Sequence, residues 1–192
     1  MDTPNRHLAD TLRNLRRQRQ WSLDAAAART GVSKAMLGQI ERGESSPTVA
    51  TLWKIAGGFE TSLSSLLVPT PPACSEPEVR RAADLRRSPA EGEMLVAPLF
   101  PFDERLGFEV FELTLPAGYV RRSAPHEPGV TEHVLVVAGC MAVCIGDRWH
   151  ALAPSEAIRF AADQPHGYRN DGDSPAVFHN LIHYPRQWGR AD

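Results

Sequence analysis

A short stretch near the N-terminus combines residue types that could recognise another molecule. The spacing of residues 34–40 predicts a helix whose inner side is an apolar stripe of Met36, Leu37 and Ile40. The outer side carries a cation, an amide and two small residues: Lys34, Ala35, Gly38 and Gln39. A helix that approaches the floor of a DNA major groove needs such a short, polar surface. Base recognition is therefore the first chemistry that the sequence indicates.

Four further helices are predicted around this one. Ser22 and Ser33 are suitable N-caps for two short helices separated by Thr30-Gly31, where glycine can take a positive φ. An amphipathic helix over Pro4 to Arg19 precedes them, a helix capped by Thr48 ends at Gly57-Gly58, and Ser62 to Leu67 forms the last. Five short helices in about 65 residues are enough for a small independent bundle.

Charge is distributed unevenly along the 192 residues. Residues 1–70 hold 9 Lys/Arg and 6 Asp/Glu, a net +3, whereas residues 71–192 hold 12 and 17, a net −5. Electrostatic affinity for phosphate is therefore expected from the helical part. No apolar run approaches the roughly 20 residues of a membrane span, and the N-terminus is polar, so we expect a cytoplasmic protein with no membrane partner.

A proline-rich segment separates the helices from a region of different texture. Val68 to Ala73 cannot continue a helix, because each proline removes a donor and restricts its predecessor. We expect residues 1–67 to form the helical domain, 68–90 an exposed linker and 91–192 a second domain. The predicted strands have the spacing of an antiparallel sandwich or barrel: Leu106–Leu115, Glu132–Val137, Met141–Ile145, Ala157–Phe160 and Val177–Tyr184. A hairpin turn at residues 146–148 predicts a further strand at Trp149.

Residues ~8–67 resemble the Cro/repressor-type (XRE) helix-turn-helix domains, which are lambda-repressor-like five-helix bundles. The resemblance lies in Ile40-Glu41-Arg42-Gly43 followed by Ser46-Pro47-Thr48. It implies that Glu41 pairs with Arg16 and that the third helix enters the groove with Ser33, Lys34, Ala35, Gly38 and Gln39. Gln39 would then contact adenine and Lys34 guanine, while Arg42 would contact phosphate. One departure is Ser22-Leu23, where the family often has Thr-Gln.

Residues ~106–185 resemble a cupin, a double-stranded β-helix jelly roll. The two motifs correspond to Gly118…His126…Glu132…Gly139 and to Pro154-Ser155-Glu156…Pro165-His166…Asn170, and both depart from the usual pattern. The resemblance implies that His126, Glu132 and His166 could meet inside the barrel as an effector pocket. Two imidazoles and a carboxylate would also suffice for a metal, so a metal-bound catalytic barrel, a metal-free ligand pocket and a purely structural barrel remain open. We expect no resident cofactor, with a metal as the less favoured alternative.

The whole chain resembles the sulfur-utilisation transcriptional regulators, through its third and fourth helices, the segment RFAADQPHGYRN and the ending LIHYPR. We therefore expect a homodimer that binds a double-stranded DNA operator, with residues 91–192 as its sensing and dimerisation domain. The resemblance implies a sulfur-containing metabolite as the small-molecule effector. The competing interpretation is a metal-dependent cupin oxygenase or isomerase fused to a DNA-binding domain.

Overall fold

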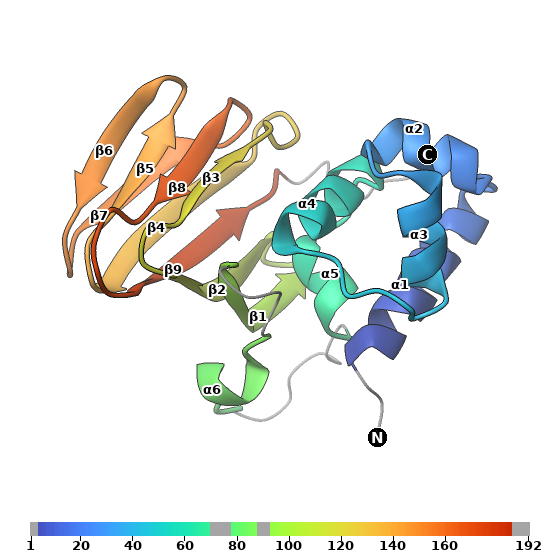
Figure 1. Ribbon diagram of the computed structural model, residues 1–192, viewed down its shortest axis with the longest axis horizontal. Helices are drawn as coiled ribbons and strands as arrows, with labels where there is room; N and C mark the ends of the chain where they lie inside the picture. Colours follow the sequence, from blue (N-terminus) through green and yellow to red (C-terminus); the bar gives the residue numbers. More distant parts are fainter. Residues whose placement is uncertain (1–3, 70–77, 88–92, 186–192) are drawn as a thin grey trace. The chain divides into compact units, whose positions relative to one another are not determined.

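A computed structural model describes residues 4–69, 78–87 and 93–185 (Figure 1). The chain divides into two compact units, and each is treated by itself. The first contains five α-helices: α1 (Pro4–Gln18), α2 (Leu23–Thr30), α3 (Lys34–Glu41), α4 (Val49–Gly58) and α5 (Leu63–Leu67). No helix in the described ranges is both long enough and apolar enough to cross a bilayer.

Hydroxyl side chains begin four of these helices. Ser22, Ser33, Thr48 and Ser62 each accept a hydrogen bond from a backbone N–H in the first turn of α2, α3, α4 and α5. Gly31 ends α2 with a φ of 65°, a conformation that glycine adopts without strain. The predicted helix starts and the turn between α2 and α3 are therefore confirmed.

The helical unit is held together by apolar side chains from every helix. Those that are at most 1% exposed include Leu12, Ala26, Leu37, Ile40, Ile55, Phe59, Leu63 and Leu66. Helices α2 and α4 approach closely, because a Cβ built on Gly58 would lie only 2.6 Å from Cα of Thr30. Gly58 thus permits the contact that fixes α2, and with it the turn that leads to α3.

The second unit consists of two antiparallel sheets. The larger has the order β1-β2-β9-β4-β7, and the smaller has the order β3-β8-β5-β6. The strands are β1 (Leu95–Asp103), β2 (Phe108–Leu115), β3 (Val120–Ser123), β4 (Thr131–Ala138), β5 (Met141–Ile145), β6 (Arg148–Leu152), β7 (Ala157–Ala161), β8 (His166–Arg169) and β9 (Ala176–His183). This architecture confirms the predicted all-β jelly roll.

Alternation along the strands directs one set of side chains inward. In β2 and β9 every second residue is buried, and the register pairs Phe111 with Asn180 and Leu113 with Phe178 on the inner face. Polar residues at inward positions, such as Asn180, are thereby enclosed with the apolar core. The barrel interior is apolar at most positions but carries a few buried polar side chains.

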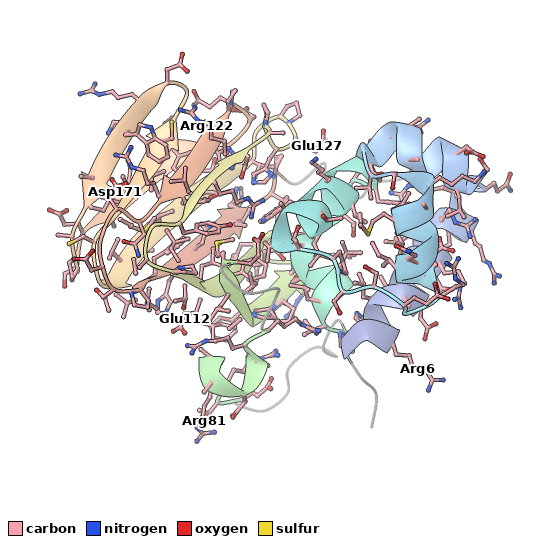
Figure 2. The ribbon with its side chains drawn as sticks, in the orientation of Figure 1. Arg6, Arg81, Glu112, Arg122, Glu127 and Asp171 are labelled. Atoms are coloured by element: carbon pink, nitrogen blue, oxygen red, sulfur yellow. The ribbon has the colours of Figure 1, made fainter. Side chains whose placement is uncertain are left out.

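The segment expected to be an exposed linker is partly built into the second unit. Residues 82–85 form α6 (Ala82–Leu85), and Arg87 makes a β-bridge with Val96 of β1. Arg86 Nη2 donates to Oε1 of Glu112 on β2 at 2.8 Å; Glu112 is labelled in Figure 2. The prolines 71 and 72 lie outside the described residues, but the charged run that follows them does not extend freely as expected.

Candidate functional site

Helix α3 is anchored through its last residue, Glu41. Nε and Nη2 of Arg16 donate to the two carboxylate oxygens of Glu41 at 2.6 and 2.8 Å, and Arg16 Nη1 also donates to the carbonyl of Trp21 at 3.0 Å. The hydrogen bond to Glu41 raises the pKa of Arg16, against the effect of its partial burial. The structure thus brings together the two residues expected to pair.

A second arginine of α1 reinforces this anchor. Arg13 Nη2 donates to the backbone carbonyl of Glu41, at the C-terminal end of α3. A cation at this end of a helix also interacts favourably with the helix dipole. The contact between Arg13 and Glu41 was not predicted from the sequence.

The opposite side of α3 is open. Ser33, Lys34, Ala35, Gln39 and Arg42 are all exposed. Lys34 Nζ lies 2.8 Å from a carboxylate oxygen of Asp24, and Arg42 binds Glu44 through two hydrogen bonds of 2.7 and 2.8 Å. Exposed pairs of this kind contribute little stability, so both cations can exchange these partners for phosphate or base atoms at small cost.

Gly38 was expected to face the groove together with its exposed neighbours, and this stays a prediction. It is buried, and a Cβ built on it would lie 3.2 Å from Nη1 of Arg42 and 3.8 Å from Leu23 of α2. At 100° per residue Gly38 lies between the exposed Lys34 and Arg42 on the helix, and the Arg42 side chain covers it. Its burial therefore comes from an exposed, flexible side chain, and the contact with Leu23 is an ordinary one.

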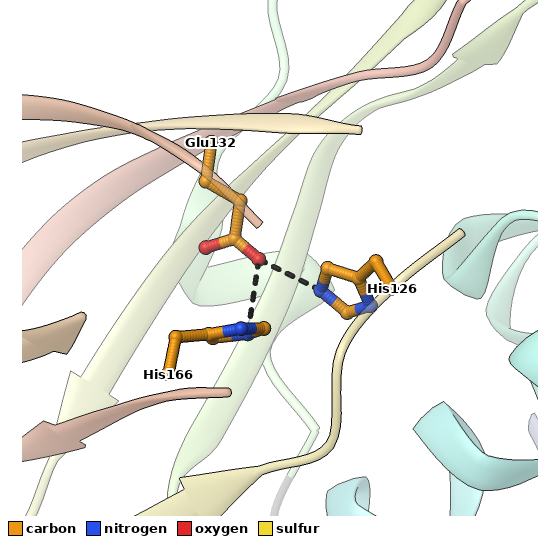
Figure 3. Close-up of side chains that lie close together, drawn as sticks. All are labelled: His126, Glu132 and His166. Carbon is orange, nitrogen blue, oxygen red and sulfur yellow. Dashed lines mark hydrogen bonds and ion pairs between the residues drawn. The ribbon is translucent and has the colours of Figure 1, made fainter. Parts of the chain in front are cut away.

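The barrel interior brings together the three residues expected to form a pocket. His126 comes from the loop before β4, Glu132 from β4 and His166 from the start of β8 (Figure 3). Oε1 of Glu132 lies 2.8 Å from Nε2 of His126 and 3.6 Å from Nε2 of His166. Each of the three residues offers one atom that could bind a metal, and these three atoms all lie within 4.8 Å of one another. The irregular spacing of the first motif is compatible with this cluster, because the loop holds His126 through its N–H to the carbonyl of Ala162.

The other carboxylate oxygen of Glu132 is also occupied. Oε2 accepts hydrogen bonds from the Tyr168 hydroxyl and from Nδ2 of Asn180, the latter at 2.9 Å. Burial alone would raise the pKa of Glu132, but the hydrogen bond and charge of His126, the charge of His166 and the Tyr168 hydroxyl lower it to about 2. Burial lowers the pKa of His166, despite the attraction of Glu132. The carboxylate is therefore ionised at neutral pH and His166 is neutral.

The donor set fits a divalent transition metal. Nδ1 of His166 lies 2.9 Å from the carbonyl of Gln164, which leaves its Nε2 lone pair directed at the cluster, and Tyr168 and Asn180 orient the carboxylate from behind. His126, Glu132 and His166 would hold the ion, and binding would replace the hydrogen bond between His126 and Glu132. Two imidazoles and one carboxylate suit iron or manganese and leave coordination positions for oxygen atoms of an effector.

Each of the two units matches a known protein family. Residues 12–66 match the helix-turn-helix family HTH_3, and residues 111–182 match the cupin domain family Cupin_2. The HTH-type transcriptional regulator SutR of Escherichia coli (strain K12) is 48% identical over 186 residues, which cover 97% of this chain and 99% of SutR. The chain belongs to the HTH-type transcriptional regulators.

Two solved structures are also similar to this chain, one over nearly its full length and one over about half of it. The crystal structure of an HTH_3 family transcriptional regulator from Vibrio cholerae is 46% identical, with a TM-score of 0.80, and covers 95% of this chain and 97% of that chain. A Cupin_2 domain of an XRE family transcriptional regulator from Enterobacter cloacae is 49% identical, with a TM-score of 0.47, and covers 48% of this chain and 97% of that chain.

Within this regulator, several barrel residues were not anticipated from the sequence. Tyr168 follows His166 by two positions on β8, so alternation directs both side chains inward. Asn180 is a polar residue at an inward position of an otherwise apolar set in β9. Arg121 is similarly the buried residue of β3. In the sequence, these residues are marked only as polar positions within an apolar alternation. Their inward direction can be recognised only when the strand register is known.

Proposed function

We propose that this regulator reads its operator with the open side of α3, through Ser33, Lys34, Ala35 and Gln39. The observation that supports this most directly is the contrast between the two sides of the helix: Leu37, Ile40 and Glu41 are buried, whereas the proposed base-contacting side chains are exposed. Packing within the helical unit does not account for the exposed side chains. Gly38 is proposed to face the groove as well, where the lack of a side chain allows a close approach to the DNA.

Individual roles follow from the chemistry of base edges. The Gln39 amide can form a bidentate pair with adenine, Lys34 can donate to guanine, and the Ala35 methyl can contact a thymine methyl. Arg42 and the N-terminal N–H groups of α2 and α4 are better suited to phosphate, which fixes the position of the protein without specifying sequence. The net charge of +3 over residues 1–70 favours the same interaction.

The functional regulator is proposed to be a cytoplasmic homodimer. One α3 helix reads only a few base pairs, so two helices on half-sites one helical turn apart would roughly double the contacts and restrict the spacing. The barrel is proposed to sense a small-molecule effector in the pocket of His126, Glu132 and His166. The resemblance to sulfur-utilisation regulators supports a sulfur-containing metabolite as the effector. The regulated genes are then proposed to be those of sulfur utilisation.

The similar full-length proteins are named as transcriptional regulators, and the chain is assigned as a regulator and not as a cupin enzyme. A metal in the barrel would therefore serve effector binding. Metal analysis of the purified protein, combined with His166→Ala, would show whether an ion contributes: a resident ion should be stoichiometric in the wild type and reduced in the variant.

The deciding experiment is genome-wide mapping of DNA sites bound by the full chain, followed by binding measurements on the strongest site. Gln39→Ala should relax preference at one base pair, and the control Gln18→Ala, an exposed glutamine of α1, should bind as the wild type does. If both variants bind with unchanged sequence preference, the proposed orientation of α3 is wrong.

A further inference from the structure

Arg121 is a buried arginine inside the barrel. It is 9% exposed and is the inward residue of β3, where it lies opposite Tyr168 of β8 in the antiparallel register. Opposite residues of a sheet direct their side chains to the same face, and Tyr168 reaches Glu132. The Arg121 guanidinium therefore shares the barrel interior with the cluster of His126, Glu132 and His166.

This guanidinium has no partner among the described residues. Its Nε is buried without a hydrogen bond, and no hydrogen bond or ion pair within the described part of the chain involves its side chain. Burial lowers the pKa of Arg121, although Tyr119, Tyr168, Glu132 and Glu93 act in the opposite direction. An arginine nevertheless stays protonated in a protein, so the barrel holds a buried cation that has no ion-pair partner among the described residues.

Glu132 attracts Arg121 electrostatically but does not form an ion pair with it. Its two oxygens accept from His126, Tyr168 and Asn180, and no oxygen of Glu132 lies within ion-pair distance of Arg121. A buried charge without a partner is strongly unfavourable, whereas the same charge becomes favourable when an anion is bound to it. The negative charge that Arg121 requires is therefore expected to come from outside the chain.

A second orphaned atom supports a polar occupant. Oδ1 of Asn180 is buried and accepts no hydrogen bond, although Nδ2 of the same amide donates to Glu132. The interior thus offers one unpaired cationic donor and one unpaired acceptor. An apolar effector would leave both unsatisfied.

We propose that the effector of this barrel is a small organic anion, whose carboxylate or sulfonate group pairs with Arg121. The inference rests on the proposed sensing role of the barrel and specifies its ligand class. Arginine suits this task because its planar, fixed set of N–H donors can bind two oxygens of one oxyanion group.

The test uses the full-length protein with acetate and methanesulfonate as anionic probes and acetamide as the neutral counterpart of acetate. Each is compared with chloride at equal ionic strength. Calorimetric titration and the thermal midpoint of unfolding are measured for each. Either anion should raise the midpoint by about 3 °C at ten times its dissociation constant, and acetamide should not. A response to only one anion distinguishes carboxylate from sulfonate recognition.

Arg121→Met should weaken anion binding at least about tenfold, the loss expected for a charge-assisted hydrogen bond. Without ligand it should be at least as stable as the wild type, because it removes an unpaired buried charge. Arg121→Lys should retain part of the anion response. The matched control is Arg122→Met, the exposed neighbour on β3 labelled in Figure 2, which should respond as the wild type does.

Three results would overturn the inference: no anion response in the wild type, an equal response in Arg121→Met, or a ligand-free Arg121→Met protein that is markedly less stable or unfolded. Operator binding is measured for the same variants, so that a failure of the anion site can be distinguished from a failure of the proposed DNA-binding function. If the wild type binds anions through Arg121 but binds no DNA, the proposed function fails while the anion site stands.

Discussion

Gln39 and Glu41 lie two residues apart on α3 but have opposite environments. Gln39 is exposed, whereas Glu41 is 6% exposed and binds Arg16 through both carboxylate oxygens. The helix therefore divides recognition and anchoring between neighbouring residues. This division can be tested, because the two side chains should affect different measurements.

Glu41→Ala should lower the free energy of unfolding of the helical unit by about 3 kcal/mol, since it leaves the partly buried Arg16 without its carboxylate partner. Gln39→Ala should leave unfolding unchanged and reduce discrimination at one base pair by about 1–3 kcal/mol. Chemical denaturation and binding to single-base operator variants measure the two effects. An exchange of these outcomes would mean that α3 faces the other way.

The buried carboxylate of Glu132 predicts a loss of stability in acid. Its pKa falls from about 4.5 in the unfolded chain to about 2 in the barrel, so its contribution is complete above pH 4.5 and is lost as the pH falls towards 2. The full loss is on the order of 3 kcal/mol. His166 adds to this loss at higher pH, below about 6.5, because burial favours its neutral form.

Unfolding of chelator-treated protein should therefore become easier from pH 6.5 downwards and steeply easier below pH 4.5. Glu132→Gln should remove the steep loss of stability below pH 4.5, although the variant is less stable than the wild type at neutral pH. A wild-type barrel whose stability is constant between pH 4.5 and 2.5 would contradict the assigned pKa.

At the scale of elements, local signals predicted the helices well and the barrel only in part. Caps such as Ser33 and Thr48 act within one turn, so the sequence specifies them directly. Strands β1, β3 and β8 were not predicted, because a strand is defined by its partners in the sheet as much as by its own residues. The cupin motifs allowed His126, Glu132 and His166 to be named in advance. The inward positions of Tyr168, Asn180 and Arg121 became evident only from the strand register.

The packing of α4 on α2 gives a prediction from adjacent glycines. A Cβ on Gly58 would lie 2.6 Å from Cα of Thr30, whereas a Cβ on Gly57 would meet nothing within 4 Å. Gly57→Ala should therefore raise the stability of the helical unit, by up to about 1 kcal/mol from helix propensity. Gly58→Ala should lower it, because backbone has to move.

Thermal unfolding compares the two variants, which differ only in the position of one methyl group. Operator affinity should fall in Gly58→Ala, since Thr30 precedes the turn into α3, and should be unchanged in Gly57→Ala. Equal stability of the two variants would show that α2 and α4 are not in close contact.

For the whole molecule, regulation requires that the barrel and the helical unit influence each other. An effector changes operator affinity only if it prefers one state of the protein over another, and the coupling free energy then acts in both directions. The helical and barrel units are joined through the chain between Leu67 and α6, and α6 contacts β1. Ligand-induced changes in the barrel thus have a covalent route to the DNA-binding helices.

Reciprocity makes this coupling measurable without knowing whether the regulator activates or represses. If a saturating anion probe changes operator affinity by a given factor, saturating operator DNA must change the affinity for that anion by the same factor and in the same sense. Titrations of each ligand in the presence and absence of the other measure both factors. Arg121→Met should abolish the effect of the anion on operator affinity while its operator affinity without anion persists. Unequal factors in the wild type would mean that the anion acts on DNA binding from a site other than the barrel.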